Sequence, residues 1–413
     1  MIKTGVTIGL LIIGLLLWLS LPVTAKTYYI DYAKGRDANK GLSKDNAWKS
    51  CPALQGFNGT YTHRPGDVFV FKGGVTWPAS VLPFKISNSG TAANNDIYTS
   101  DSSWYQGDSF QQPFFTAEHK QIPLVYAEKQ SFFAINGLHF ADFGTSGVAN
   151  HGKGIEIMAC GNYTLSNCTI APQAWLGLYL HSYSGSLSEN ITIENNDISS
   201  AGQAIVICTE AANTILKNVT ITKNHIHDLS SQIVGETHGD GIHTWNSPES
   251  DTSQYITRLV ISYNRFDGDF SRTGPGTASM TALIYLTDPG RQARIFNNTL
   301  TYSKATSFAS LIWIRYFDDV RIYNNTLVQQ PALGGIAIMV GQGNASENVV
   351  ITNNTLSGCQ SAYYIYIDAT PSIRIDSNRC HTTSMTIGYW NETGRDAMAW
   401  RALGNDVNGL LSE

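Results

Sequence analysis

Apolar and polar positions along most of the chain follow a phrase of about eight residues that recurs at intervals of about 30 residues. Seven segments carry it clearly, namely ITIENNDI (191–198), VTITKNHI (219–226), LVISYNRF (259–266), ARIFNNTL (293–300), VRIYNNTL (320–327), VVITNNTL (349–356) and IRIDSNRC (373–380). Two weaker copies, FFAINGL (132–138) and YTLSNCTI (163–170), precede them. A repeat of this length predicts a solenoid with one copy in each coil.

One position of the phrase is apolar in all nine copies. Its members are Phe133, Leu165, Ile193, Ile221, Ile261, Ile295, Ile322, Ile351 and Ile375. Stacked parallel strands bury such a column, because each coil covers the apolar face of the coil before it. The pattern therefore predicts a parallel sheet whose inner face lines a continuous core.

A second position, three residues further along, is asparagine in eight of nine copies. The column consists of Asn136, Cys168, Asn196, Asn224, Asn264, Asn298, Asn325, Asn354 and Asn378. A buried amide at a tight bend can bond backbone groups there and the next amide in the stack, and asparagine tolerates left-handed turn geometry. We therefore predict an asparagine ladder that runs along the solenoid.

Each coil has a second short strand after its turn. These segments are GIEIM (154–158), GLYLH (177–181), AIVIC (204–208), GIHTW (241–245), LIYLT (283–287), LIWIR (311–315), GIAIM (335–339) and YIYID (364–368). Alternation places Ile155, Ile157 and their equivalents inward. The intervening residues should form two solvent-facing columns, which read Glu156, Tyr179, Val206, His243, Tyr285, Trp313, Ala337, Tyr366 and Met158, His181, Cys208, Trp245, Thr287, Arg315, Met339, Asp368.

The ladder, the coil length and the strand phrase resemble the pectate-lyase-like superfamily over residues 130–390. The resemblance implies an all-β fold, a single-stranded right-handed parallel β-helix with an asparagine ladder and an N-terminal cap. The segments 28–50, 64–74 and 86–97 resemble the capping region of many bacterial members. Residues 26–130 are thus expected to form the cap and first irregular coils, 131–390 the β-helix, and 391–413 a C-terminal capping segment. The superfamily hosts lyases, hydrolases, epimerases and non-catalytic binders, so no single activity follows.

The first 25 residues match a secretory signal peptide, with Lys3, an apolar run from Ile8 to Leu19 and a small-residue cleavage site at Ala25. A membrane anchor is the competing interpretation, but the run is short for a spanning helix. We expect a secreted or periplasmic protein, free of the membrane after cleavage. Charged residues make up only 14% of the chain and the net charge is −5, without a basic run, which argues against nucleic acid as a partner. Six cysteines have no metal-binding spacing and suit a core as well as disulfides.

The sharpest candidate for chemistry is the segment ETHGDGIHTW (236–245). It offers Glu236, His238, Asp240 and His243 within ten residues, in the longest coil, where extra residues should form loops beside the outward face. Glycines on both sides of Asp240 permit close backbone approach. An ordinary turn that opens a strand is the structural alternative.

The outward residues His243, Tyr285 and Arg315 should span roughly 12 Å, the reach of one or two sugar units. β-Elimination from a uronic acid needs a base for the C5 proton, a cation for the carboxylate and an acid at the leaving oxygen. We expect His243 to be the base, Arg315 or a bound Ca²⁺ the cation, and Tyr285 the acid, with Asp240 and His238 beside them. C5 epimerisation needs nearly the same groups.

The remaining outward residues are candidates for other roles. Substrate contacts are expected from Tyr179, His181, Trp245, Trp313 and Tyr366, because aromatic side chains are costly on an open face unless something binds there or a loop covers them. If calcium binds, Glu210, Glu236 and Asp240 are the candidate ligands. We interpret His225 and His227, on either side of inward Ile226, as solvated turn residues.

The sequence therefore favours a secreted lyase or C5 epimerase that acts as a monomer on an acidic, uronate-containing polysaccharide. Known β-helix lyases often use a Lys or Arg base with calcium, and no Lys stands in the two outward columns. Inverting hydrolases of this fold use clustered aspartates, and Asp240 has no second aspartate at the next outward position. A glycoside hydrolase and a non-catalytic glycan-binding or structural β-helix remain the alternatives.

Overall fold

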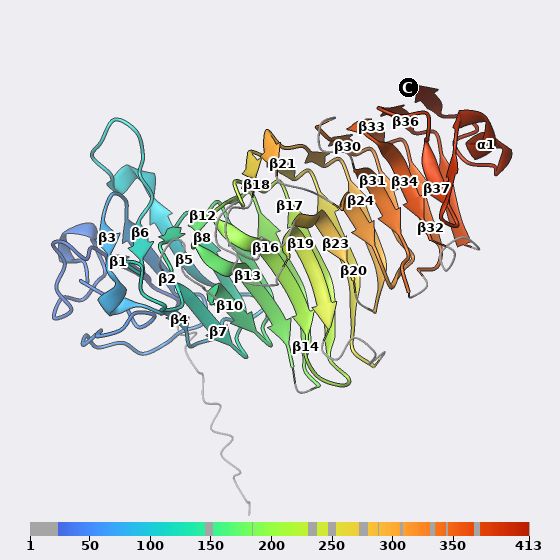
Figure 1. Cartoon of the computed structure of the whole chain (residues 1–413). Helices are drawn as coiled ribbons and strands as arrows, with labels where there is room; N and C mark the ends of the chain where they lie inside the picture. Colours follow the sequence, from blue (N-terminus) through green and yellow to red (C-terminus); the bar gives the residue numbers. More distant parts are fainter. Residues whose placement is uncertain are drawn as a thin grey trace, which may run out of the picture.

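A computed structural model of the chain describes residues 24–144, 152–183, 185–229, 238–246, 253–271, 280–287, 289–305, 309–330, 335–343, 346–366 and 372–412. The described chain winds into a solenoid whose strands stack in chain order from one end of the molecule to the other (Figure 1). Three long sheets form its walls, and the strands within each are parallel except at the C-terminal edge, where β37 and β38 pair antiparallel. The molecule is a right-handed parallel β-helix, as the repeat and the resemblance predict.

The repeated phrase forms the sheet that we name sheet A. Its strands, in spatial order, are β1 (Thr27–Ile30), β2 (Val68–Lys72), β5 (Asp96–Asp101), β8 (Ser131–Asn136), β11 (Gly161–Ser166), β14 (Leu187–Glu194), β17 (Ile215–Thr222), β20 (Tyr255–Ser262), β24 (Gly290–Phe296), β29 (Arg321–Tyr323), β32 (Val349–Thr352) and β35 (Ile373–Asp376), with β28 (Phe317–Asp318) beside β24.

Short strands after each asparagine turn form sheet B. They are β3 (Thr76–Trp77), β6 (Phe114–Thr116), β9 (His139–Ala141), β12 (Thr169–Ala171), β15 (Asp197–Ile198), β18 (His225–His227), β21 (Arg265–Asp267), β25 (Thr299–Leu300), β30 (Thr326–Val328), β33 (Thr355–Cys359), β36 (Arg379–Thr382) and β39 (Leu410–Ser412).

The predicted second strands form sheet C. They are β4 (Phe84–Ile86), β7 (Val125–Glu128), β10 (Lys153–Met158), β13 (Ala174–Ser182), β16 (Ala201–Thr209), β19 (Gly239–Asn246), β23 (Met280–Leu286), β27 (Ser310–Ile314), β31 (Ile336–Val340), β34 (Ser361–Ile365), β37 (Gly388–Trp390) and β38 (Thr393–Arg395). A separate pair joins β22 (Asp269–Phe270) to β26 (Lys304–Ala305).

The apolar column of the repeat sets the register of sheet A. Leu165 pairs with Ile193, and the predicted column then continues in register to Ile375. Each of these side chains is at most 1% exposed, and burial of one isoleucine stabilises the fold by about 1.5–3 kcal/mol. The first copy was aligned wrongly: Ile135 pairs with Leu165, whereas the Phe133 ring stacks on Tyr163 with centroids 5.0 Å apart.

The asparagine column forms a continuous chain of hydrogen bonds. Asn196 Nδ2 donates to Asn224 Oδ1 over 3.0 Å, and the same contact recurs from Asn224 through Asn378. At the end of the column Asn378 Nδ2 donates to Asp406 Oδ1 over 2.9 Å. Asn136 lies outside this chain, because its amide bonds Thr99, Ser166 and Asn167 instead. The left-handed residue of each turn is the one before the ladder asparagine, for example Tyr263 with φ 56°.

The segments at the two ends continue the same architecture. The region predicted as a cap and irregular coils supplies the first strands of all three sheets. At the other end, β39 pairs with β36, and Trp400 of helix α1 (Ala397–Ala402) is buried against Tyr363 with ring centroids 5.2 Å apart. Short 3₁₀ turns are η1 (Lys44–Asn46), η2 (Ala79–Val81) and η3 (Ser102–Trp104). No helix in the described ranges is long and apolar enough to span a membrane.

Candidate functional site

The outward side of sheet C carries the predicted site, but it is far less open to solvent than expected. Tyr179, Val206 and His243 pair in register, and Tyr285 and Trp313 continue the column. All five are at most 8% exposed, so the prediction of a solvent-facing column is wrong at these positions. Beyond Trp313 the column continues through Met339 and Tyr364, not Ala337 and Tyr366, a shift of two residues from the predicted alignment.

Strand β19 brings together three of the predicted residues. The Asp240 carboxylate is completely buried, and its Oδ2 lies 2.7 Å from His238 Nδ1 and 3.5 Å from His243 Nδ1. The backbone N–H of Ala282 in the next coil donates to Asp240 Oδ1 over 3.2 Å. The two histidine rings meet edge to face with centroids 5.3 Å apart. A buried carboxylate thus sets the position of an imidazole on each side of it.

His243 and His238 differ sharply in their surroundings. The His243 side chain is 8% exposed, with Nδ1 3.1 Å from Gln203 Oε1 and Nε2 3.3 Å from Thr287 Oγ1. Burial lowers the pKa of His243 to about 4, against the opposing pull of Asp240, so the ring is neutral at neutral pH. The His238 side chain is 41% exposed and reaches solvent. His238 is therefore the imidazole of this pair that a large substrate can touch.

A line of aromatic rings leads away from the histidines along sheet C. Tyr285 stacks on His243 with centroids 5.0 Å apart, and Trp313 follows at 4.9 Å from Tyr285. Further along, Tyr364 lies 4.6 Å from Tyr366 and 5.0 Å from Tyr389. Trp245 is only partly buried, beside the apolar group that contains Tyr179. Of these rings, Trp245, Tyr364, Tyr366 and Tyr389 are partly exposed and can meet a sugar, whereas Tyr285 and Trp313 are buried.

On the other side of β19, a second group of polar residues lies on β10, β13 and the end of β16. His181 Nδ1 is 3.2 Å from Glu210 Oε2, and its Nε2 is 3.6 Å from Glu156 Oε1. Glu210 also accepts a hydrogen bond from the Tyr179 hydroxyl. The contact with His181 is the main cause that lowers the pKa of Glu210 to about 2. Burial lowers the pKa of His181, but the two glutamates outweigh it and the pKa is raised. Two carboxylates thus flank one imidazole.

Sequence reasoning missed several members of this second group. Lys153 Nζ lies 2.7 Å from Glu156 Oε1 and 4.2 Å from the centre of the Tyr179 ring. Glu128 accepts hydrogen bonds from the Tyr126 and Tyr183 hydroxyls. Burial and then this bond raise the pKa of Tyr126 to about 12, and the bond is the main cause of the same rise at Tyr183. Lys153 precedes the inward Ile155 by two positions. Alternation would therefore have placed Lys153 inward, so the strand pattern could not have predicted its contacts with Glu156 and Tyr179.

The other candidate site residues do not gather at one point. The Nε–H of Arg315 donates to the backbone oxygen of Gln342 over 2.9 Å. Of the three candidate calcium ligands, Glu210 contacts Tyr179 and His181, Asp240 contacts the two histidines of β19, and Glu236 lies outside the described residues. The six cysteines are buried and form no disulfide with one another.

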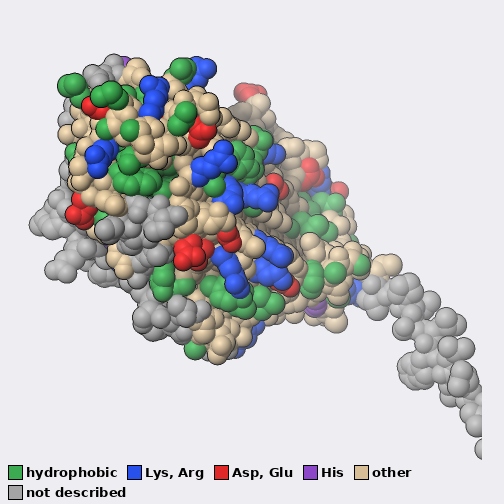
Figure 2. Space-filling model, turned by 90° about the vertical axis from the view of Figure 1, so that its right-hand side faces the viewer, with side chains coloured by type: hydrophobic (Ala, Val, Ile, Leu, Met, Phe, Trp, Pro, Cys, Tyr) green, Lys and Arg blue, Asp and Glu red, His purple; other side chains and the backbone are tan. Residues whose placement is uncertain are grey.

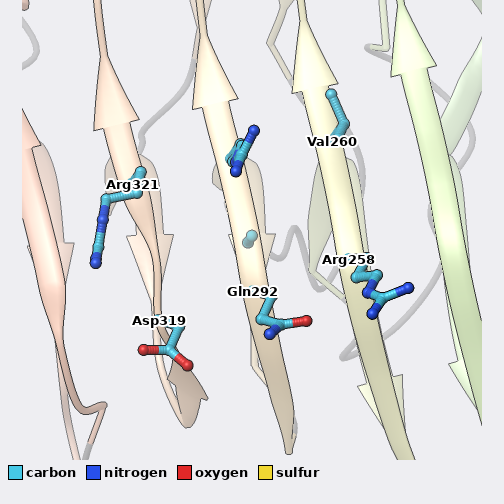
Figure 3. A pocket seen from close by; sticks show the side chains of 7 residues that line it. Arg258, Val260, Gln292, Asp319 and Arg321 are labelled. Carbon is cyan, nitrogen blue, oxygen red and sulfur yellow. The ribbon is translucent and has the colours of Figure 1, made fainter.

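Two further groups lie away from sheet C. Arg258, Arg294 and Arg321 line a pocket of about 480 Å³ on sheet A (Figure 3), and Figure 2 shows Lys and Arg side chains close together on the surface. This pocket suits an anion, but no histidine lines it. On sheet B, His225 and His227 belong to strand β18 and form ion pairs with aspartates, so their interpretation as solvated turn residues is wrong.

Comparisons with known proteins found a family model and several similar solved structures. A family model described as a right handed beta helix region matches residues 125–257. Similar solved structures include a GH136 lacto-N-biosidase from Eubacterium ramulus, with 12% identity, 94% of this chain and 67% of that chain covered and a TM-score of 0.48. An alginate lyase from Paenibacillus sp. has 14% identity, 79% and 92% coverage and a TM-score of 0.38. The surface adhesin PfbA of Streptococcus pneumoniae has 12% identity, 79% coverage of both chains and a TM-score of 0.48. No curated protein matches.

Proposed function

We propose that the protein is a polysaccharide lyase or C5 epimerase that abstracts the C5 proton of a uronate unit, with His238 as the group that moves the proton. The observation that carries this proposal is the pairing of His238, 41% exposed, with the completely buried carboxylate of Asp240. When Nδ1–H donates to Asp240, the basic atom of the ring is Nε2. The buried carboxylate also stabilises the imidazolium that forms on protonation.

The remaining steps need a cation for the uronate carboxylate and a proton for the leaving oxygen. His238 takes the C5 proton while the guanidinium of Arg315 neutralises the uronate carboxylate. In elimination the C4–O bond breaks, the electron pair of the C5–H bond forms the C4=C5 double bond, and the leaving oxygen takes a proton from water, because Tyr285 is only 6% exposed. In epimerisation no C–O bond breaks, and a proton returns to the opposite face of C5. The Tyr285 ring centre lies 5.9 Å from that of His238.

His238 replaces His243 as the proposed base. A base must reach the proton that it abstracts, whereas His243 is buried with contacts at both ring nitrogens. A ring with a pKa of about 4 would also be a weak base near neutral pH. We assign His243 the role of a neutral spacer that holds Asp240 and the Tyr285 ring in place.

Glycoside hydrolysis is less well supported. It requires one protonated carboxylic acid, usually with a raised pKa, and one carboxylate. The candidate pair, Glu156 and Glu210, lies on either side of His181, and the pKa of each carboxyl is lowered. Neither can serve as the acid near neutral pH. This group instead suits the binding of sugar hydroxyls beside the proposed centre.

Calcium remains part of the proposal only as an additive to test. Glu210 and Asp240 each contact histidines or a tyrosine of separate groups, so the described residues do not form a shared oxygen cage of the kind that Ca²⁺ prefers. No step above requires it. We further propose that residues 1–25 direct export and are removed.

The decisive experiment follows the ultraviolet absorbance of the new C4=C5 bond. The mature protein is incubated with alginate, pectate and glycosaminoglycans, each with calcium and with chelator, and C5 deuterium incorporation in D₂O is measured in parallel. A lyase gives absorbance, and an epimerase gives deuterium without absorbance. Either signal should disappear in His238→Ala and persist in His381→Ala, a change of an exposed histidine on β36.

The non-catalytic alternative has one specific observation in its favour, the group of partly exposed rings of Tyr364, Tyr366 and Tyr389, which could bind sugars without chemistry. Saturable binding of a polysaccharide, with neither absorbance nor deuterium nor new reducing ends, would contradict the enzymatic proposal. That outcome would make glycan binding the function.

A further inference from the structure

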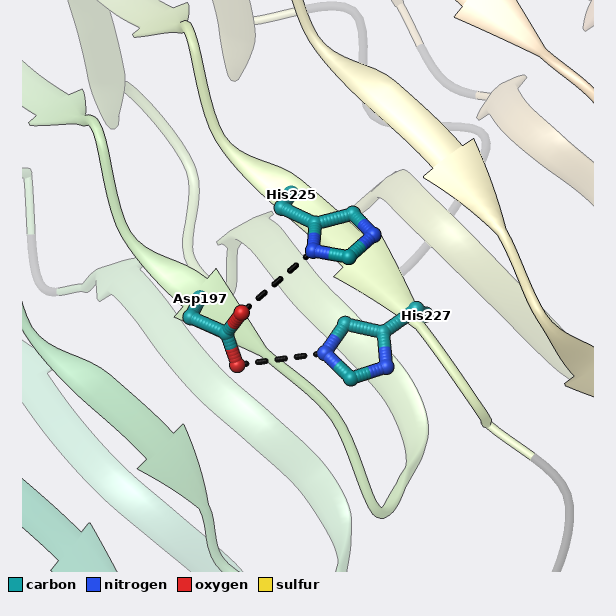
Figure 4. Close-up of side chains that lie close together, drawn as sticks. All are labelled: Asp197, His225 and His227. Atoms are coloured by element: carbon teal, nitrogen blue, oxygen red, sulfur yellow. Dashed lines mark hydrogen bonds and ion pairs between the residues drawn. The ribbon is translucent and has the colours of Figure 1, made fainter.

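The outward side of sheet B holds a compact group of two histidines and an aspartate that sheet C chemistry does not use. Asp197 lies on β15, and His225 and His227 lie two residues apart on β18, so both imidazoles project to the same side (Figure 4). One ligand atom from each residue can be chosen so that all three lie within 4.8 Å of one another. Among the described residues this is the single group of three metal-binding side chains.

Each imidazole directs one nitrogen at the same carboxylate. His225 Nδ1 lies 3.3 Å from Asp197 Oδ2, and His227 Nε2 lies 3.1 Å from Asp197 Oδ1. The two rings stack with centroids 4.2 Å apart and planes 20° from parallel. The histidine nitrogens therefore converge on one side of Asp197, with the separation that adjacent ligands of one metal ion require.

The remaining nitrogen of each ring is held by another carboxylate. His225 Nε2 lies 2.7 Å from Asp267 Oδ1, and His227 Nδ1 lies 2.7 Å from Asp228 Oδ2. Metal-binding histidines typically donate their second N–H to a carboxylate in this way, which selects the tautomer and fixes the ring. Asp267 and Asp228 thus orient the two rings, and Asp197 remains available as a ligand.

A third layer fixes the outer carboxylates. The backbone N–H of Asp269 donates to Asp228 Oδ1 over 2.7 Å, and Arg265 Nε pairs with Asp267. Gly268, at φ +90°, allows this approach, because a Cβ there would lie 2.5 Å from Asp228 Oδ1. The group is also accessible, since the Asp197 and His225 side chains are 47% and 35% exposed. An ion could enter from solvent without unfolding a coil.

We propose that Asp197, His225 and His227 bind a divalent first-row transition metal ion, with Zn²⁺ as the best fit. Two imidazoles and one carboxylate are a ligand set that Zn²⁺ accepts at about 2.0–2.2 Å, with further positions left to water or to a ligand oxygen. Hard cations such as Ca²⁺ prefer six or more oxygens and fit two imidazoles poorly. The site lies on a different sheet from His238 and does not depend on the proposed function.

The alternative is a hydrogen-bonded network that links β15, β18 and β21 without a metal. Both arrangements would hold the same side chains in place, so the stability of the variants alone does not separate them. Binding of the metal to the unmodified chain separates the two alternatives, because a network of hydrogen bonds alone would not bind Zn²⁺.

The test uses the mature chain without a polyhistidine tag. Equilibrium dialysis against Zn²⁺, and titration with Co²⁺ followed by its visible absorption, measure stoichiometry and ligand field. We expect one tight equivalent of Zn²⁺ and a Co²⁺ spectrum typical of nitrogen and oxygen ligands. Asp197→Asn and His227→Ala should each weaken Zn²⁺ binding at least about 10-fold, and Asp228→Asn, which alters only an outer partner, by about 10-fold. His381→Ala should bind as the parent does.

Two outcomes would overturn the proposal. The first is an absence of saturable Zn²⁺ and Co²⁺ binding to the parent chain. The second is binding that persists unchanged in both Asp197→Asn and His227→Ala while their far-ultraviolet circular dichroism shows the native fold. Polysaccharide turnover by His227→Ala is measured as well, since its retention alongside lost metal separates this site from the His238 centre.

Discussion

The molecule holds two pairs of histidines on neighbouring walls of the same solenoid, and they meet opposite environments. On sheet C, burial lowers the pKa of His243 to about 4, although Asp240 lies 3.5 Å away. On sheet B, hydrogen bonds with Asp197 and then Asp228 raise the pKa of His227 to about 9, against partial burial. One ring is neutral and the other is a cation at neutral pH.

The difference shows which effect dominates at each site. His243 has one carboxylate neighbour, Asp240, which it shares with His238. The loss of hydration lowers the pKa of His243 more than this carboxylate raises it. His227 is 20% exposed and has a carboxylate at each nitrogen, so ion pairing outweighs the smaller loss of hydration. The neutral, buried His243 suits a site in which His238 moves a proton. The accessible, carboxylate-rich surroundings of His227 suit a bound cation.

The largest expected effect tests the role of Asp240 on sheet C. Asp240→Asn removes the charge that orients His238 and stabilises its protonated form, so kcat/KM on the uronate polymer should fall by about 10²–10⁴-fold. Steady-state rates of double-bond formation or deuterium exchange provide the measurement. Loss of less than about 3-fold, with the fold intact, would contradict the assignment. His381→Ala is the matched control.

The next effect belongs to sheet B. Zn²⁺ at about 100 times its Kd should stabilise the native chain by about 2.7 kcal/mol, because it binds the folded site. Urea unfolding with and without Zn²⁺ measures this shift. The shift should vanish in His227→Ala and survive in His243→Gln. Equal shifts in both variants would show that the metal binds elsewhere.

A smaller effect is the pH dependence that burial of His243 imposes. Its folded pKa of about 4 lies below the ordinary value of 6.5, so the unfolded chain binds the extra proton as pH falls. Stability is therefore lost between about pH 6.5 and pH 4, and the His243 contribution should drop by about 2 kcal/mol from pH 7 to pH 5. Urea midpoints of the parent and His243→Gln at both pH values test this. The parent should lose more stability than the variant.

The smallest effect has the opposite sign and concerns His227. Its folded pKa of about 9 exceeds 6.5, so its contribution is complete below pH 6.5 and is lost as pH rises through 9. After solvent screening we expect about 1 kcal/mol. In metal-free buffer, His227→Gln should destabilise the chain at pH 6 and leave it nearly unchanged at pH 10. A deficit that is the same at both pH values would indicate lost packing instead.

Much of the architecture could be predicted because equivalent residues of successive copies of the repeat stack on one another. A one-residue slip would expose a whole apolar column, so the isoleucines from Ile193 to Ile375 specify their own register. The register of the first copy was mispredicted. Its Phe133 ring stacks on Tyr163, a contact between two aromatic rings that the later copies of the phrase do not have at this position. The column through Asp197, His225 and Arg265 was equally readable from the alignment and would have placed the first two side by side.

The sequence by itself determined the coil, the strands of sheets A and C and the stacking from Leu165 to Ile375, since these depend on burial of apolar columns and on hydrogen bonds between equivalent positions. Sheet B, the third wall, was not among the predicted strands. Only the tertiary structure decided how exposed each outward residue is and which way its ring nitrogens point. Both depend on groups from other coils, such as Gln203 and Thr287 around His243 or Asp267 beside His225. Hydration and carboxylate contacts set the protonation of a histidine, and both depend on residues of other coils as well as on its own segment.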